Sequence, residues 1–169
     1  MWLEGLPVFA GWVLSYDKPV LLVLEDQSHL EPTVKYLIRA GFDKLIGFLK
    51  GGIESWYNAG LPTEHLELLS VHHLKDMVDR EEDLLVLDTR EHNEFASGHV
   101  QGAINIYVGH LEREISRVPD DKPVAVFCTV GNRASMGASI LLRTGHKKVY
   151  TVLGSVKAWV AAGFPVTKD

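Results

Sequence analysis

The sequence predicts an α/β protein in which a parallel sheet flanked by helices is preceded by a truncated, degenerate copy of the same unit. Short apolar runs alternate with segments of helical spacing along the 169 residues, and this alternation favours a parallel sheet. The runs at 84–87 and 124–127 are continuous, as expected for strands that helices cover on both faces. A repeat within the chain indicates that this unit occurs twice.

The repeat relates the first third of the chain to its last third at an offset of 104, and later 103, residues. Each copy begins with Lys-Pro-Val and an apolar run, continues with a helical segment that glycine ends, and closes on Ala-Gly-x-Pro. The matching stretches are 18–24 with 122–128, 36–42 with 140–146, 49–56 with 152–159, and 59–62 with 162–165. We therefore expect an incomplete unit at 1–62, a linker at 63–70 and an intact unit at 70–169, with a tryptophan of each last helix turned inward.

The intact unit reads as strands and helices in turn. Ser70 is a suitable N-cap for a helix, and Pro119 is expected to stop another. The expected helices are 71–78, 91–96 and 111–118, and the expected strands before the cysteine are 84–87 and 103–106.

Composition excludes several function classes. The net charge of −5, with 17 scattered basic residues, offers no surface for nucleic acid or for an acidic membrane. No apolar run is long enough to span a bilayer, and Glu4 and Pro7 argue against a signal peptide. A single cysteine excludes an intramolecular disulfide, which suits a reducing compartment. We expect a cytoplasmic protein without a metal or other cofactor.

The cysteine lies where chemistry is expected. Cys128 follows the apolar run 124–127, and four residues separate it from Arg133, where a helical segment begins. Backbone N–H groups and the dipole at a helix start stabilise an anion. We therefore expect Cys128 to be present largely as a thiolate near neutral pH.

Several motifs in order resemble the rhodanese family over about 70–169. They are Asp88-Thr89-Arg90, Glu94-Phe95, the stretch 98–106, the loop from Cys128 to Arg133, and 154–159. The family's fold is a five-stranded parallel sheet flanked by helices, with the cysteine loop at the strand ends. The segment before the repeat, 9–17, looks like the linking segment of proteins that fuse a metallo-β-lactamase-fold sulfur dioxygenase to rhodanese units.

The resemblance implies sulfurtransferase activity. Cys128 would take a sulfane sulfur from thiosulfate or a persulfide and pass it to a thiol or cyanide. The loop N–H groups would hold the terminal sulfur, Gly131 would allow the curled backbone, and Arg133 would bind the leaving group. The implied substrate-binding residues are Thr129, Val130, Gly131, Asn132, Arg133, Asp88 and Arg90. A structural ion pair is an equal alternative for Asp88 with Arg90.

Two other functions are weighed against sulfur transfer. Cysteine phosphatases of this fold enclose phosphate with one residue more between cysteine and arginine than this chain has. A binding module is the second alternative, and it suits 1–62, where Leu24 and His29 replace Cys128 and Arg133. The missing part of that copy should leave an open strand edge, so we expect a homodimer or a clamp onto 70–169.

Overall fold

The computed structural model describes residues 3–168. The chain forms two compact units, Met1–Glu64 (unit 1) and His65–Asp169 (unit 2). Each unit is described by itself.

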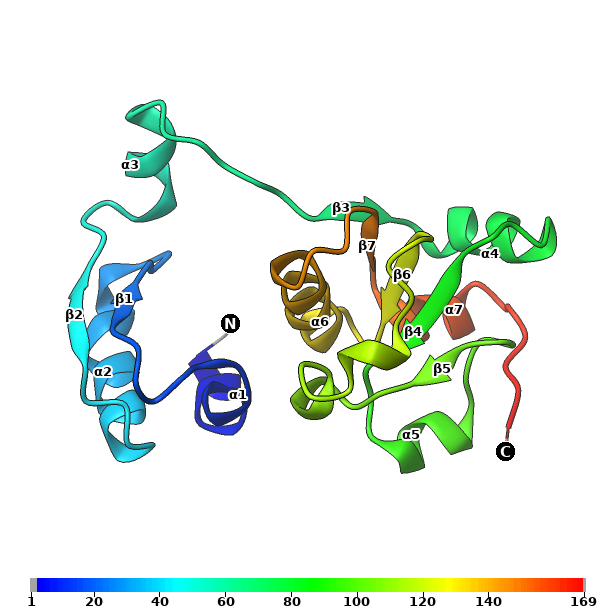
Figure 1. The fold of residues 1–169 in the computed structure, drawn as a ribbon, viewed down its shortest axis with the longest axis horizontal. Helices are drawn as coiled ribbons and strands as arrows, with labels where there is room; N and C mark the ends of the chain where they lie inside the picture. The colour runs from blue at the N-terminus through cyan, green and yellow to red at the C-terminus, as the bar shows by residue number, and fades with distance from the viewer. Residues whose placement is uncertain (1–2, 169) are drawn as a thin grey trace. The chain divides into compact units, whose positions relative to one another are not determined.

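Unit 2 is built on a five-stranded parallel sheet with the strand order β3-β7-β6-β4-β5, which confirms the predicted fold class (Figure 1). Its strands are β3 (Glu67–Leu69), β4 (Leu85–Asp88), β5 (Ile104–Asn105), β6 (Val124–Phe127) and β7 (Val149–Val152). Its helices are α4 (Val71–Asp79), α5 (His92–Ser97), α6 (Asn132–Arg143) and α7 (Ser155–Ala161), with 3₁₀ turns η3 (Val108–His110) and η4 (Ile115–Arg117).

Helices cover both faces of this sheet, so the central strand β6 is buried along its whole length. Val126 faces α6, because it is one of the side chains nearest to Gly137 of that helix. Phe127 points to the opposite face and packs edge-on against Trp159 of α7, with ring centroids 6.0 Å apart. The continuous apolar run 124–127 therefore reflects a strand covered on both faces.

Two local predictions differ from the structure. The predicted linker 63–70 contains β3, a short edge strand that pairs with β7. The predicted helix 111–118 is replaced by turns and η4. Leu111 is fully buried all the same, so the apolar spacing there reflects packing of a turn rather than an α-helix.

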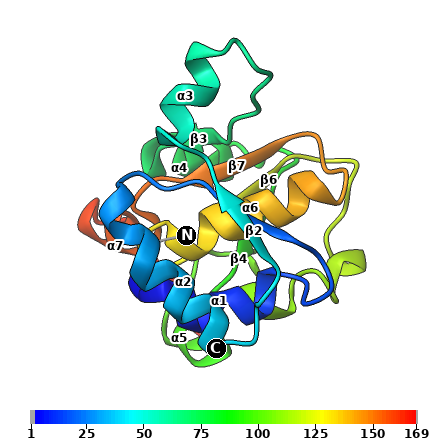
Figure 2. The ribbon, with the colours of Figure 1, turned by 90° about the vertical axis from the view of Figure 1, so that its left-hand side faces the viewer.

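Within its described residues 3–64, unit 1 has two parallel strands and no counterpart of the first half of unit 2 (Figures 1 and 2). The helix α1 packs against α2, and the core contains Leu22, Leu37 and Phe42. Its elements are η1 (Leu3–Gly5), α1 (Leu6–Val13), β1 (Val20–Leu22), η2 (Gln27–His29), α2 (Leu30–Arg39), β2 (Leu45–Phe48) and α3 (Gly52–Asn58).

The incomplete sheet leaves apolar side chains of unit 1 in solvent. In unit 2 the matching strand β6 has neighbours on both sides, whereas β1 pairs, among the residues that the structure describes, only with β2. Leu21 and Ile46 are 56% and 68% exposed. Trp159 is buried, as predicted, but the matching Trp56 of α3 is only partly covered. Unit 1 thus keeps the local elements of the repeat without the layer that would cover them.

Candidate functional site

The sulfur of Cys128 lies at the carboxyl end of the central strand of unit 2. Cys128 directly follows β6, which β4 and β7 flank on either side. Open parallel sheets bind their ligands at this edge. The residue is almost completely buried, with 1% of its surface exposed.

The loop after Cys128 turns back on the sulfur. The backbone N–H of Gly131 donates a hydrogen bond to Sγ of Cys128 at 3.1 Å. Gly131 has a φ of +115° and precedes the first turn of α6. A side chain at this residue would strain the backbone, even though a Cβ there would meet no other atom within 4 Å. Negative charge on the sulfur therefore meets a backbone donor at the start of a twelve-residue helix.

Ser155 supports Cys128 from the start of α7, and the sequence alone did not predict this contact. Its hydroxyl accepts the backbone N–H of Cys128 at 3.1 Å and donates to the carbonyl of Val152 at 3.0 Å. Ser155 is fully buried and has a φ of +46°, a conformation that disfavours residues other than glycine. The sequence signal that could have pointed to Ser155 is the difference between the two copies, in which Gly52 of the first corresponds to serine in the second.

Arg133 forms an ion pair with Glu94 of α5. Nη1 of Arg133 lies 2.6 Å from Oε2 of Glu94, and Nη2 lies 2.8 Å from Oε1. The hydroxyl of Thr129 joins the two, since it donates to Oε1 of Glu94 at 2.9 Å and accepts from Nη2 of Arg133 at 2.8 Å. The three side chains form one closed network beside the cysteine loop.

The Arg133 guanidinium lowers the pKa of Glu94 to about 2, and the hydroxyl of Thr129 contributes to this shift. Glu94 in turn raises the pKa of Arg133, and charge on Cys128 adds to this effect. Burial raises the pKa of the nearby Tyr107, and the charge of Glu91 raises it further. At neutral pH the network therefore contains an ionised carboxylate and an ionised guanidinium.

Glu94 was recognised in the sequence only as part of a motif. Its local pattern is that of a capping box, in which its side chain accepts the backbone N–H of Glu91 at 3.2 Å. This local role hides the contact with Arg133, which lies 39 residues further along the chain.

Asp88 and Arg90 have the geometry of a structural ion pair. Nη2 of Arg90 lies 2.7 Å from Oδ2 of Asp88 and also donates to the carbonyl of Gly98 at 2.7 Å. The side chains are only 1% and 5% exposed. The two side chains thus form a buried ion pair that fixes the turn after β4, and their role in substrate binding stays a prediction.

The remaining predicted residues lie on the solvent side of the loop. Val130 is 45% exposed, and Asn132 is also exposed. The structure thus brings Cys128, Thr129, Gly131 and Arg133 together in one loop.

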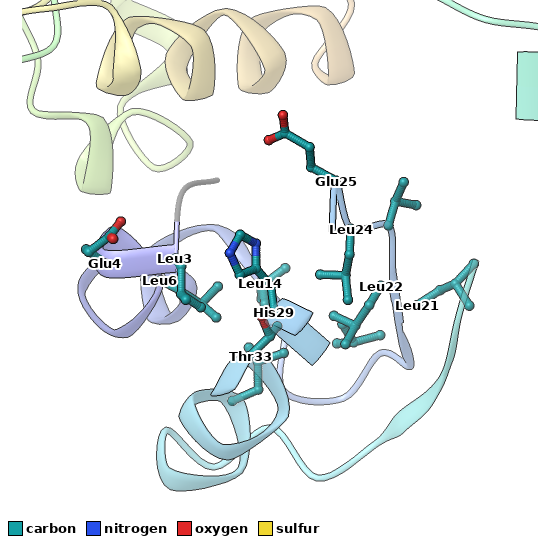
Figure 3. A pocket seen from close by; sticks show the side chains of 13 residues that line it. Leu3, Glu4, Leu6, Leu14, Leu21, Leu22, Leu24, Glu25, His29 and Thr33 are labelled. Atoms are coloured by element: carbon teal, nitrogen blue, oxygen red, sulfur yellow. The ribbon is translucent and has the colours of Figure 1, made fainter. Parts of the chain in front are cut away.

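Unit 1 has a pocket of about 450 Å³ next to the end of β1 (Figure 3). Leu24, which replaces the cysteine, and His29, which replaces the arginine, both line it. Leu6 and Leu22 contribute apolar surface, and Glu25 adds a carboxylate. The pocket therefore has neither a thiol nor a guanidinium.

Within residues 3–168, no cluster of three or more histidine, cysteine, aspartate or glutamate residues is arranged to hold a metal ion. Among the same residues, no helix is both long and apolar enough to cross a membrane.

Comparisons with known proteins agree on one family. Residues 70–162 match the rhodanese-like domain. The chain is 31% identical over 110 residues to the putative sulfur carrier protein YrkF of Bacillus subtilis, with 65% of this chain and 57% of YrkF covered. It is 32% identical over 91 residues to the thiosulfate sulfurtransferase GlpE of Shewanella oneidensis, with 54% of this chain and 89% of GlpE covered.

A solved structure shows the same likeness. The rhodanese-related protein of Thermoplasma volcanium superposes with a TM-score of 0.56 at 28% identity, over 61% of this chain and 99% of that protein. The match to the family extends over more than half of the chain and includes the cysteine loop, β4 and α7. The chain belongs to the rhodanese family.

Proposed function

We propose that the protein is a sulfurtransferase that carries a sulfane sulfur on Cys128. The observation that carries the proposal is the position of Sγ of Cys128, which accepts the Gly131 N–H at the carboxyl end of the central strand. The similarity to a thiosulfate sulfurtransferase and to a putative sulfur carrier supports this chemistry. Thiosulfate and persulfides are the proposed donors, and thiols and cyanide are the proposed acceptors.

The reaction proceeds in two displacements at sulfur. The Cys128 thiolate attacks the outer sulfur of the donor, a new S–S bond forms, and the donor's bond to that sulfur breaks. With thiosulfate, the electron pair of the broken bond leaves on sulfite. An acceptor thiolate or cyanide then attacks the outer sulfur of the Cys128 persulfide and releases the Cys128 thiolate. The Gly131 N–H lies where it stabilises negative charge on the sulfur in both steps.

The loop geometry does not favour the phosphatase alternative. The loop has four residues between Cys128 and Arg133, and its Gly131 N–H is directed at sulfur. The guanidinium that would bind a phosphoryl group is engaged by Glu94.

The test is a mass measurement on the intact protein. After incubation with thiosulfate or an alkyl persulfide, wild-type protein should gain the mass of one sulfur atom and release it on addition of cyanide, as thiocyanate. The Cys128→Ser variant should gain none. Absence of the adduct with every sulfane donor would refute the proposal, and hydrolysis of an aryl phosphate that requires Cys128 would favour the phosphatase.

For unit 1 we propose a non-catalytic role in which the open edge of β1 pairs with a second copy of the chain. The support is the unpaired side of β1 and the exposed side chains of Leu21 and Val23. Light scattering should give the mass of a dimer, which Leu21→Asp should reduce to one chain. The control is Val8→Asp on α1, which is equally exposed and should leave the dimer intact. A wild-type mass of one chain would exclude the homodimer. We also propose, from the resemblance of segment 9–17 to a linking segment, that this chain occurs fused to a metallo-β-lactamase-fold domain.

A further inference from the structure

The only cation that the cysteine loop itself contributes to the site is already neutralised. Both terminal nitrogens of Arg133 are bonded to the two carboxylate oxygens of Glu94, at 2.6 and 2.8 Å. Nη2 is shared further with the hydroxyl of Thr129. The side chains of Arg133 and Glu94 are 17% and 33% exposed, so water screens this pair less than it screens a surface pair. An anionic substrate that needs the guanidinium must compete with a carboxylate already bound to it.

The other guanidinium at this end of the sheet, that of Arg90, supplies no replacement. Arg90 is paired with Asp88 and buried, and the charge of Glu91 is close enough to raise the pKa of Tyr107. A lysine also borders the loop, since the backbone N–H of Lys157 in α7 donates to the carbonyl of Thr129 at 3.0 Å, but this residue is exposed to solvent. The Glu94 carboxylate is therefore the charge that an anionic donor meets at the Arg133 guanidinium.

Sulfane donors differ in the charge that they bring to such a site. Thiosulfate carries two negative charges. The reacting group of an ionised persulfide or of a thiosulfonate carries only one. Repulsion grows in proportion to the charge of the donor. We propose that Glu94 is a specificity-determining residue that selects singly charged sulfane donors, the persulfides and thiosulfonates, against the thiosulfate dianion. This inference rests on the proposed sulfur transfer at Cys128.

Methanethiosulfonate is the matched probe, because it differs from thiosulfate by a methyl group in place of a charged oxygen. With it, the Cys128 thiolate forms an S–S bond to the outer sulfur, and the bond from that sulfur to the sulfonyl group breaks. The electron pair leaves on methanesulfinate, so two negative charges stand on each side of the equation. With thiosulfate the same step releases sulfite, and three negative charges stand on each side.

The experiment compares kcat/KM for the two donors, with cyanide as acceptor, in wild-type protein and in Glu94→Gln. The variant keeps the size of the side chain and removes its charge. Removing one charge a few ångströms from the donor should raise kcat/KM by about tenfold for thiosulfate and about threefold for methanethiosulfonate, since the monoanion feels half the repulsion. The preference for the monoanion should therefore fall by about threefold. Added salt should narrow this preference in the wild type and do so less in the variant.

Glu112→Gln is the control for net charge. Glu112 pairs with Arg143 at 2.8 Å on the surface, where both side chains are more than half exposed. The substitution removes the same charge from the same chain and should leave kcat/KM unchanged for both donors. Unfolding curves of both variants, and a persulfide adduct on Glu94→Gln with methanethiosulfonate, show that the loop is still formed.

The outcomes separate this inference from the proposed function. One outcome is that the wild type forms a Cys128 persulfide while Glu94→Gln changes kcat/KM by the same factor for both donors, or for neither. In that case the role of Glu94 is refuted and sulfur transfer stands. The same holds if Glu94→Gln lowers kcat/KM for thiosulfate, because Glu94 would then serve to place Arg133 for the dianion. If no donor yields an adduct on wild-type Cys128, the proposed function itself fails.

Discussion

Gly137, in the middle of α6, is the position where adding one methyl group tests the packing most directly. A Cβ at this residue would lie 3.0 Å from Cγ2 of Thr89, 3.1 Å from Cγ1 of Val126 and 3.5 Å from Cδ2 of Leu111. All three neighbours are fully buried, so they have little room to move. The matching residue of the first copy is Thr33, in a unit that has no counterpart of β4 or of the Thr89 that follows it. The glycine is therefore required by the completed sheet rather than by the helix.

The expected effect of Gly137→Ala is the difference between two opposing contributions. Alanine in a helix interior is favoured over glycine by about 1 kcal/mol, whereas overpacking a rigid core costs about 1–3 kcal/mol. Because two of the three contacts are tighter than ordinary van der Waals contact, overpacking should prevail. We expect the free energy of unfolding of unit 2 to fall by about 1 kcal/mol.

Urea unfolding followed by the fluorescence of Trp159 measures this change, in a background where Trp2, Trp12 and Trp56 are phenylalanine. Trp159 is buried and belongs to unit 2, so it reports that unit alone. The control is Gly11→Ala in α1, where the nearest neighbour is the Tyr16 hydroxyl at 3.7 Å. Because Gly11 belongs to unit 1, this control should leave the urea midpoint reported by Trp159 unchanged. A Gly137→Ala protein as stable as wild type, or more stable, would refute the packing argument.

Three further predictions concern the same unit. Glu94 has its pKa lowered from 4.5 to about 2, so the stability it confers through Arg133 is present above pH 4.5 and is lost as the pH falls towards 2. After allowance for solvent screening, the free energy of unfolding of wild type, measured by urea titration, should exceed that of Glu94→Gln by about 1–2 kcal/mol at pH 7. Near pH 2 this difference should vanish. An equal difference at both pH values would contradict the prediction. Both Ser155→Ala and Ser155→Gly lose the bond to the Cys128 N–H, but only glycine relieves the positive φ. The glycine variant should thus be the more stable of the two by about 1 kcal/mol, and equal unfolding midpoints would show that the backbone is unstrained. Trp159→Phe removes a 2.8 Å bond to a backbone carbonyl and should lower the thermal midpoint through a loss of about 1–3 kcal/mol, whereas an unchanged midpoint would show that water replaces this bond.

The elements that could be predicted from the sequence are those whose signal is local or duplicated. The strands around Cys128 stand out because continuous apolar runs are typical of covered parallel strands, and the repeat marks where helices end. The strand β3 could not be predicted, since three residues are too few to show a period. Its place in the sheet depends on pairing with β7, more than eighty residues away.

The candidate site was predicted as far as it lies in one loop. Cys128, Gly131 and Arg133 lie within six residues of one another, so their spacing alone predicts that they share one loop. Glu94 and Ser155 reach the loop from α5 and from the start of α7. The capping box hides the contact of Glu94, and Ser155 stands out only when the two copies of the repeat are compared. Tertiary contacts of this kind set the charge and the rigidity of the loop, and they become visible only in the folded unit.

The bond from Ser155 to Cys128 also bears on how the protein is made. During synthesis Cys128 leaves the ribosome well before Ser155, and β3 finds its only strand partner when β7 appears. The growing chain therefore holds the Cys128 thiol on an unfinished loop until α7 has emerged. Because contacts between distant residues slow folding, this interval is when the thiol is open to unintended oxidation. Labelling of Cys128 on stalled nascent chains should accordingly drop once Ser155 to Ala161 has cleared the exit tunnel.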